Sequence, residues 1–175
     1  MHGGRTPHRL RRMHRPLLLA LALFAVLAPA AGGETRSIDL PRLFATQLER
    51  AHAQTEVPIL LPQTMRSDFA RHFPEGRARP NAWRFDIGAA RNCNTSTACF
   101  VAEFKAVSDG RPSGRRTIRL TRGRTGYYRP LACGASCSPP SVEWRERHAL
   151  YSIQAKVSRR ELVRMANSAI RNGPR

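Results

Sequence analysis

Hydrophobic residues alternate with polar ones over much of the chain, and this pattern predicts strands. In residues 82–87, large hydrophobic side chains face one way and charged ones the other, which is typical of a half-buried strand. The same period of two recurs in residues 98–107, 117–122, 127–131, 142–147 and 150–157. Clusters of turn-forming residues separate these stretches, so we expect about six antiparallel strands joined by short turns.

Two stretches carry the three- and four-residue hydrophobic spacing of amphipathic helices. The first covers residues 38–54. The second follows Ser158, with Glu161 three residues later, a capping box in which the serine hydroxyl accepts from the third helical amide and the glutamate reaches back. It ends at Gly173. The sequence therefore predicts an α+β fold, an antiparallel sheet with an N-terminal and a C-terminal helix packed on one face.

Three stretches interrupt these patterns. Residues 57–62 form a short apolar run with a proline near each end, which suits an edge strand or an extended segment. Residues 64–81 contain prolines, a glycine and many polar residues, so we expect a long surface loop there. Residues 133–140 are expected to form no regular structure.

The first thirty residues have the pattern of an export signal. Residues 1–15 hold five arginines and no acid, residues 17–27 are all apolar, and small residues follow at Ala28 and Ala30. A retained membrane anchor is the alternative, but a bilayer needs about 20 apolar residues. We expect cleavage after Ala30 and a single periplasmic or secreted domain over residues 31–175, with no transmembrane segment left.

Four cysteines remain after this signal. Cys93 and Cys99 form one close pair along the chain, and Cys133 and Cys137 form another. In an oxidising compartment an even number of cysteines indicates disulfides. Four cysteines permit three pairings, but proximity favours the two local bonds, each of which would clamp one loop.

The chain is strongly basic, with 30 Lys and Arg residues against 12 Asp and Glu. Residues 1–30 contain five of the basic residues and none of the acids, which leaves a formal charge of +13 on residues 31–175. One explanation is an anionic envelope surface or an acidic partner. The other is the Arg-rich composition of a GC-rich genome. An exported protein meets no chromosomal DNA, so no nucleic-acid partner is expected, and the sequence gives no oligomeric state.

No pattern in the sequence assigns catalytic, cofactor-binding or metal-binding residues. His52, His72 and His148 lie in no known motif, and Ser136 lacks the flanking glycines of a nucleophile elbow. The cysteine spacing does not complete a zinc site, and there is no Cys-x-x-Cys redox motif. We expect no cofactor.

The last third of the chain combines several short motifs. These are Gly-x-x-Gly-Tyr-Tyr from Gly123, Cys-Gly-Ala-Ser-Cys from Cys133, Trp144 seven residues before Tyr151, and the helix sequence Glu161-Leu-Val-x-Met-Ala-Asn-Ser. This set resembles small exported bacterial domains of unknown function, including extracytoplasmic domains attached to sporulation and anti-sigma regulators. The resemblance implies a sheet-and-helix module outside the cytoplasm and assigns no catalytic residue.

Two hypotheses of function follow. The leading one is an exported, non-enzymatic binding or envelope-associated module with two disulfide-clamped loops, because no reaction-capable set of residues accompanies the folding signals. The alternative is an envelope hydrolase whose residues meet only in space. A histidine beside a carboxylate and a serine in a pocket would favour it.

Overall fold

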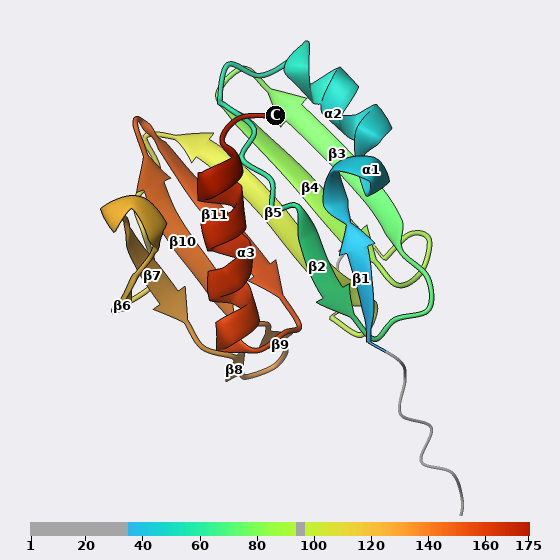
Figure 1. The fold of residues 1–175 in the computed structure, drawn as a ribbon. Coiled ribbons are helices and arrows are strands. Elements are labelled where there is room, and N and C mark those ends of the chain that lie inside the picture. Colours follow the sequence, from blue (N-terminus) through green and yellow to red (C-terminus); the bar gives the residue numbers. More distant parts are fainter. Residues whose placement is uncertain (1–34, 94–96) are drawn as a thin grey trace, which may run out of the picture. The chain divides into compact units, whose positions relative to one another are not determined.

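A seven-stranded antiparallel sheet forms the centre of the computed structural model, which describes residues 35–93 and 97–175 (Figure 1). The leader predicted for residues 1–30 lies outside these ranges. In spatial order the strands are β3 (Phe73–Arg79), β4 (Ala82–Gly88), β5 (Phe100–Ser108), β11 (Ala149–Ala155), β10 (Ser141–Glu146), β7 (Thr125–Arg129) and β6 (Arg116–Arg119).

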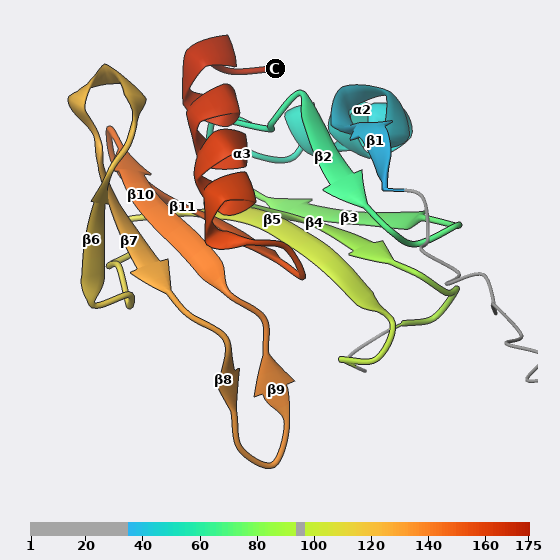
Figure 2. The same ribbon diagram turned by 60° about the horizontal axis from the view of Figure 1, so that its bottom comes forward.

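Two small ladders and three helices complete the described structure. The ladders pair β1 (Arg36–Asp39) with β2 (Thr64–Ser67) and β8 (Ala132–Cys133) with β9 (Cys137–Ser138). The helices are α1 (Leu40–Leu43), α2 (Ala45–His52) and α3 (Arg159–Asn172), and η1 (Thr121–Gly123) is a single 3₁₀ turn. Helix α2 packs against β3 and α3 against β10 and β11, and Figure 2 shows both on the same side of the sheet. None of the helices in the described ranges has the length and apolar character needed to span a bilayer.

The core lies between the sheet and these helices. Register places Phe85, Phe104, Ile153 and Val142 in one row across four neighbouring strands, and all four are at most 1% exposed. The ring of Phe44 stacks on Phe85 with centroids 5.1 Å apart. Burying such a side chain stabilises the fold by roughly 1.5–3 kcal/mol.

Helix α3 begins and ends where the sequence predicts. The Ser158 hydroxyl accepts from the Glu161 amide at 3.2 Å, and Gly173 follows the last turn with a φ of 73°. The Glu161 carboxylate does not return to the Ser158 amide, however, because it pairs with Arg164. The predicted capping box is therefore only half formed.

The prediction of one N-terminal helix over residues 38–54 is wrong. Its first two residues belong to β1, and the Asp39 carboxylate caps the first helix by accepting from the Arg42 amide at 3.0 Å. The backbone then leaves helical geometry at Phe44, with φ −99° and ψ 17°, so that α1 and α2 are separate. The side chain of Phe44 is fully buried.

The predicted surface loop over residues 64–81 is also wrong, because this segment contains β2 and β3. Strand β3 is an edge strand, where a proline such as Pro74 is tolerated. Gly76 permits the close approach of α2, since a Cβ atom there would lie 2.7 Å from the Gln47 side chain. The main sheet accordingly has seven strands and not about six.

One further segment differs from expectation, and another takes one of the two forms expected for it. Residues 133–140, expected to form no regular structure, contain all of β9 and the end of β8, and Cys133 lies directly opposite Cys137. Residues 57–62 form no strand but cross the core as an extended, mostly buried segment. The carbonyl of Pro58 accepts from Trp83 Nε1 at 3.2 Å and from the Tyr151 hydroxyl at 3.0 Å, which fixes this segment to the sheet.

Candidate functional site

Both pairs of cysteines form disulfides, and each bond closes a short loop. Cys93 is bonded to Cys99 between β4 and β5, and Cys133 is bonded to Cys137 across β8 and β9. These are the two local pairs that sequence proximity favours. The two loops border the same groove, because Thr97 and Cys137 are both among its lining residues.

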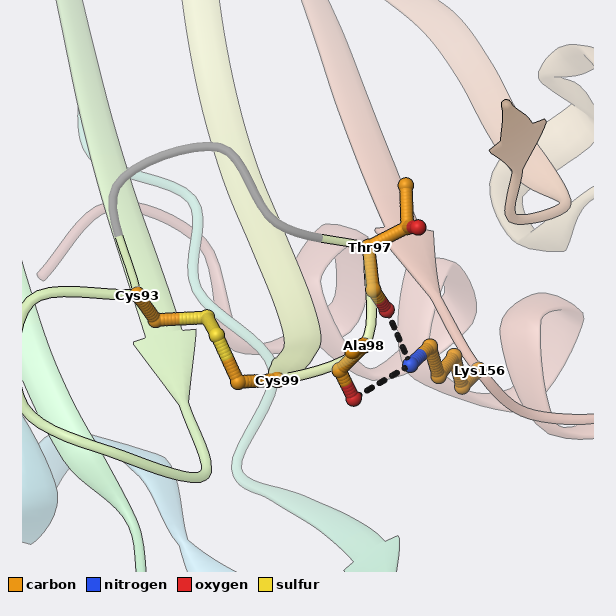
Figure 3. Close-up of a disulfide and its surroundings, with 5 residues drawn as sticks. All are labelled: Cys93, Thr97, Ala98, Cys99 and Lys156. Carbon is orange, nitrogen blue, oxygen red and sulfur yellow. Dashed lines mark hydrogen bonds between the residues drawn. A yellow bond between two sulfur atoms is a disulfide. The ribbon is translucent and has the colours of Figure 1, made fainter. Parts of the chain in front are cut away.

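Lys156 connects the first clamped loop to the end of β11 (Figure 3). Its Nζ atom donates to the Ala98 carbonyl at 3.1 Å and to the Thr97 carbonyl. The same ammonium group lies 5.8 Å from the centroid of the Phe69 ring. One side chain therefore joins the loop, the sheet and the segment after β2.

A groove of about 1200 Å³ opens between the clamped loops, β2 and the first turn of α3. Its apolar side chains come from segments that are far apart in the sequence and include Met65, Phe69, Val101, Leu131, Pro140 and Val157. Met65 and Val101 are buried at its base, whereas Leu131 on the β8–β9 side is 60% exposed. Concave sites that are mostly apolar with a few polar groups are typical of small-molecule binding.

Four cations and two carboxylates also line the groove, and one ion pair accounts for part of this charge. The carboxylate of Glu161 accepts from Arg164 Nε at 2.8 Å and from its Nη2 at 2.6 Å. This pairing lowers the pKa of Glu161 and raises the pKa of Arg164. Asp68 accepts from the Thr35 hydroxyl at 2.6 Å.

Two guanidinium groups at the groove remain without such partners. Arg66 on β2 and Arg160 on α3 are both exposed, and neither side chain forms an ion pair or hydrogen bond with the described residues. The charge of Arg66 does act on Glu161, and it helps to lower the pKa of that carboxyl. The sequence does not single out either residue, since one lies in a segment interpreted as a loop and the other is one of many arginines. The groove thus combines an apolar base with two available cations.

The residues considered for catalysis do not come together. Ser136 is exposed in the turn of the β8–β9 ladder, and His148 is exposed between β10 and β11. His52 contacts the backbone carbonyl of Arg175. Within residues 35–93 and 97–175, no cluster of His, Cys, Asp and Glu is arranged to hold a metal ion.

His72 has a serine partner that the sequence did not indicate. Its Nε2 atom lies 2.9 Å from the Ser67 hydroxyl, which also accepts from the Phe69 amide at 3.2 Å. Burial lowers the pKa of His72 and so favours the neutral imidazole. None of the described carboxylates hydrogen-bonds to this histidine. Ser67 and His72 thus supply two of the three residues of a catalytic triad. The hydrogen bond from the Phe69 amide to Ser67 closes the turn after β2.

A pair of carboxylates lies on the opposite face of the sheet. Register places Asp86 beside Glu103, and Arg84 bridges them, with Nε 2.8 Å from Asp86 and Nη2 2.9 Å from Glu103. Lys105 adds a second cation, 2.7 Å from Glu103. Desolvation is the largest effect on Asp86 and raises its pKa. We interpret this cluster as an ion-pair network, because each carboxylate is matched by a cation.

No protein-family model, curated protein or solved structure matches this chain. The resemblance to sporulation and anti-sigma domains therefore stays a prediction from short motifs.

Proposed function

We propose that this chain is an exported, non-enzymatic binding module and that its groove takes an amphiphilic anion. Such a ligand has an apolar chain and a carboxylate or phosphate head. The observation that carries the proposal is the apolar base beside Arg66 and Arg160, two exposed guanidinium groups that form no ion pair or side-chain hydrogen bond within the described residues. Guanidinium groups bind carboxylate and phosphate in bidentate geometry, and burial of an apolar chain contributes about 25 cal/mol per Å².

The disulfides support the exported part of this proposal. Two disulfide bonds are compatible with an exported protein, since cytosolic proteins are kept reduced. The leader expected in residues 1–30 points the same way. We therefore propose a periplasmic or secreted location, where the excess positive charge would attract an anionic partner in the envelope.

A hydrolase is the second candidate, favoured by the contact between Ser67 and His72. Ser67 lines the groove, so an acyl ester would bring its carbonyl near that hydroxyl. Acyl transfer also needs an oriented base and oxyanion donors. Turnover of p-nitrophenyl decanoate that is lost in the Ser67→Ala variant would establish this activity, and binding without turnover would support the module.

Calorimetry with three probes tests the proposed ligand class. Decanoate, below its micellar concentration, has both a chain and a charge. Butyrate has the charge with a short chain, and monomeric decyl maltoside has the chain without the charge. We expect decanoate to bind at least tenfold more tightly than either control.

Two variants test the role of the guanidinium groups. Arg66→Gln/Arg160→Gln is expected to weaken decanoate binding by about tenfold or more, since a hydrogen bond to a charged group contributes roughly 1.5–3 kcal/mol. The matched control is Arg50→Gln, which removes an exposed charge from α2, outside the groove. Equal loss in both variants, or equal affinity for decanoate and decyl maltoside, would contradict the proposal.

A further inference from the structure

The β8–β9 hairpin is an uncharged projection on a highly charged protein. Residues 130–142 contain no Asp, Glu, Lys or Arg, although Arg129 precedes them and Glu143 follows. Residues 131–138 are all exposed, and Leu131 is the one large hydrophobic side chain that is exposed in the described ranges. Figure 2 shows the hairpin extending away from the sheet.

The hairpin is held in shape by covalent and backbone contacts. Cys133 and Cys137 lie opposite each other and are bonded. At its base, Gln154 Nε2 on β11 donates to the Pro139 carbonyl at 2.9 Å. A projection fixed in this way loses little conformational entropy when another surface binds it.

Three arginines, which we name the basic collar, lie beside the base of this hairpin: Arg116, Arg159 and Arg160. Register places Arg116 opposite Tyr128, and the Arg159 guanidinium lies 5.2 Å from the centroid of the same ring. Arg160 lines the groove together with Leu131. All three are exposed, and none forms an ion pair within the described part of the chain.

Nearby acids do not neutralise the collar. Glu161, the next residue after it, is paired with Arg164. Glu143, the first acid after the hairpin, accepts from the Ser113 amide at 2.6 Å and from the Gly114 amide at 3.1 Å. The collar therefore presents net positive charge at the base of an uncharged hairpin.

We infer that the β8–β9 hairpin inserts shallowly into an anionic lipid bilayer while the basic collar binds the phosphate groups of its surface. Apolar side chains beside basic ones are the pattern of interfacial membrane anchoring, and clustered arginines favour anionic lipid headgroups. This interface shares Arg160 and Leu131 with the groove, whereas Ala135 at the hairpin tip lies outside the groove and allows the two inferences to be tested separately.

Vesicle co-sedimentation of the oxidised protein recovered after export tests the interface. Vesicles of phosphatidylcholine with 30% phosphatidylglycerol are compared with phosphatidylcholine alone. Ala135→Asp adds a charge at the hairpin tip, outside the groove, and Ala45→Asp adds the same charge at an exposed position of α2. We expect the tip variant to bind anionic vesicles at least fivefold more weakly and the control to be unchanged.

An Ala135→Trp variant reports insertion directly. The native tryptophans, Trp83 and Trp144, are at most 2% exposed, so quenching by dibrominated lipid reports the tip. Insertion predicts a blue shift and quenching with anionic vesicles. Unchanged emission, or equal vesicle binding by Ala135→Asp and the wild type, would overturn the inference, and binding to heparin with no effect of the tip variant would instead indicate an acidic polysaccharide. Decanoate affinity of Ala135→Asp, expected to be unchanged, separates this result from the groove proposal.

Discussion

Lys156 Nζ lies 3.1 Å from the carbonyl oxygen of Ala98, and this contact fastens the clamped loop between β4 and β5 to the end of β11. Lys156→Met removes the hydrogen bonds to Ala98 and Thr97 while keeping most of the aliphatic stem. The free energy of unfolding is expected to fall by about 0.5–1.5 kcal/mol. Urea denaturation measures the change, and unaltered stability would show that the contact does not hold the loop.

Gly76 and Gly134 provide a matched pair for the packing of α2. A Cβ atom at Gly76 would lie 2.7 Å from the Gln47 side chain and 3.0 Å from Phe85, whereas nothing lies within 4 Å of one at Gly134. Gly76→Ala is expected to destabilise the fold by about 1–3 kcal/mol through overpacking. Gly134→Ala should change stability by less than about 0.5 kcal/mol. Similar unfolding midpoints for the two variants would contradict this view of the edge strand.

The ion pair between Glu161 and Arg164 makes part of the stability depend on pH. The hydrogen bonds that the Glu161 carboxylate accepts from Arg164 lower the folded-state pKa of Glu161 below its value in the unfolded chain. The contribution is therefore complete above the unfolded pKa and is lost as the pH falls through the folded one. Glu161→Gln should cost about 0.5–1 kcal/mol at pH 7, and this cost should shrink as the pH falls through the folded-state pKa of Glu161. Glu49→Gln, an exposed change on α2, is the control, and a penalty that persists in acid would rule out the ion pair as its cause.

The disulfides are expected to fix the shape of the two loops more than they stabilise the sheet and α3. Each bond closes a short loop, so its loss should cost on the order of 2 kcal/mol in the loop-closure model. Reduction is expected to preserve the far-ultraviolet circular dichroism of the sheet and α3 while weakening decanoate binding. Non-reducing peptide mapping checks the pairing, and a peptide linking Cys93 to Cys133 or Cys137 would contradict it.

Local periodicity predicts the helices and strands in which tertiary contacts do not override the preference of the local sequence. The alternation in β4, β5, β10 and β11 is strong enough to predict them, and Ser158 and Gly173 give the two ends of α3. Strand β3 could not be predicted in this way, because Pro74 and Gly76 disfavour a strand locally. Its position at the sheet edge and its contact with Gln47 make both residues acceptable.

The groove could not be predicted, because contacts between distant segments create it. Arg66 and Arg160 are brought together by the packing of α3 against β2, and Leu131 belongs to a hairpin on a third segment. Sequence spacing also cannot show that β11 pairs with β5, which places Lys156 beside Val101 and the first clamped loop. The cysteines are the exception, since proximity along the chain already favoured their pairing.

Chemical-shift mapping of the oxidised protein titrated with decanoate tests the groove most directly. The expected result is saturable perturbation centred on the amides of Arg66, Phe69, Val157 and Arg160, with little change on the opposite face at Asp86 and Glu103. Perturbations centred on that opposite face, or no saturable perturbation below the micellar concentration, would contradict the assignment of the groove as the binding site.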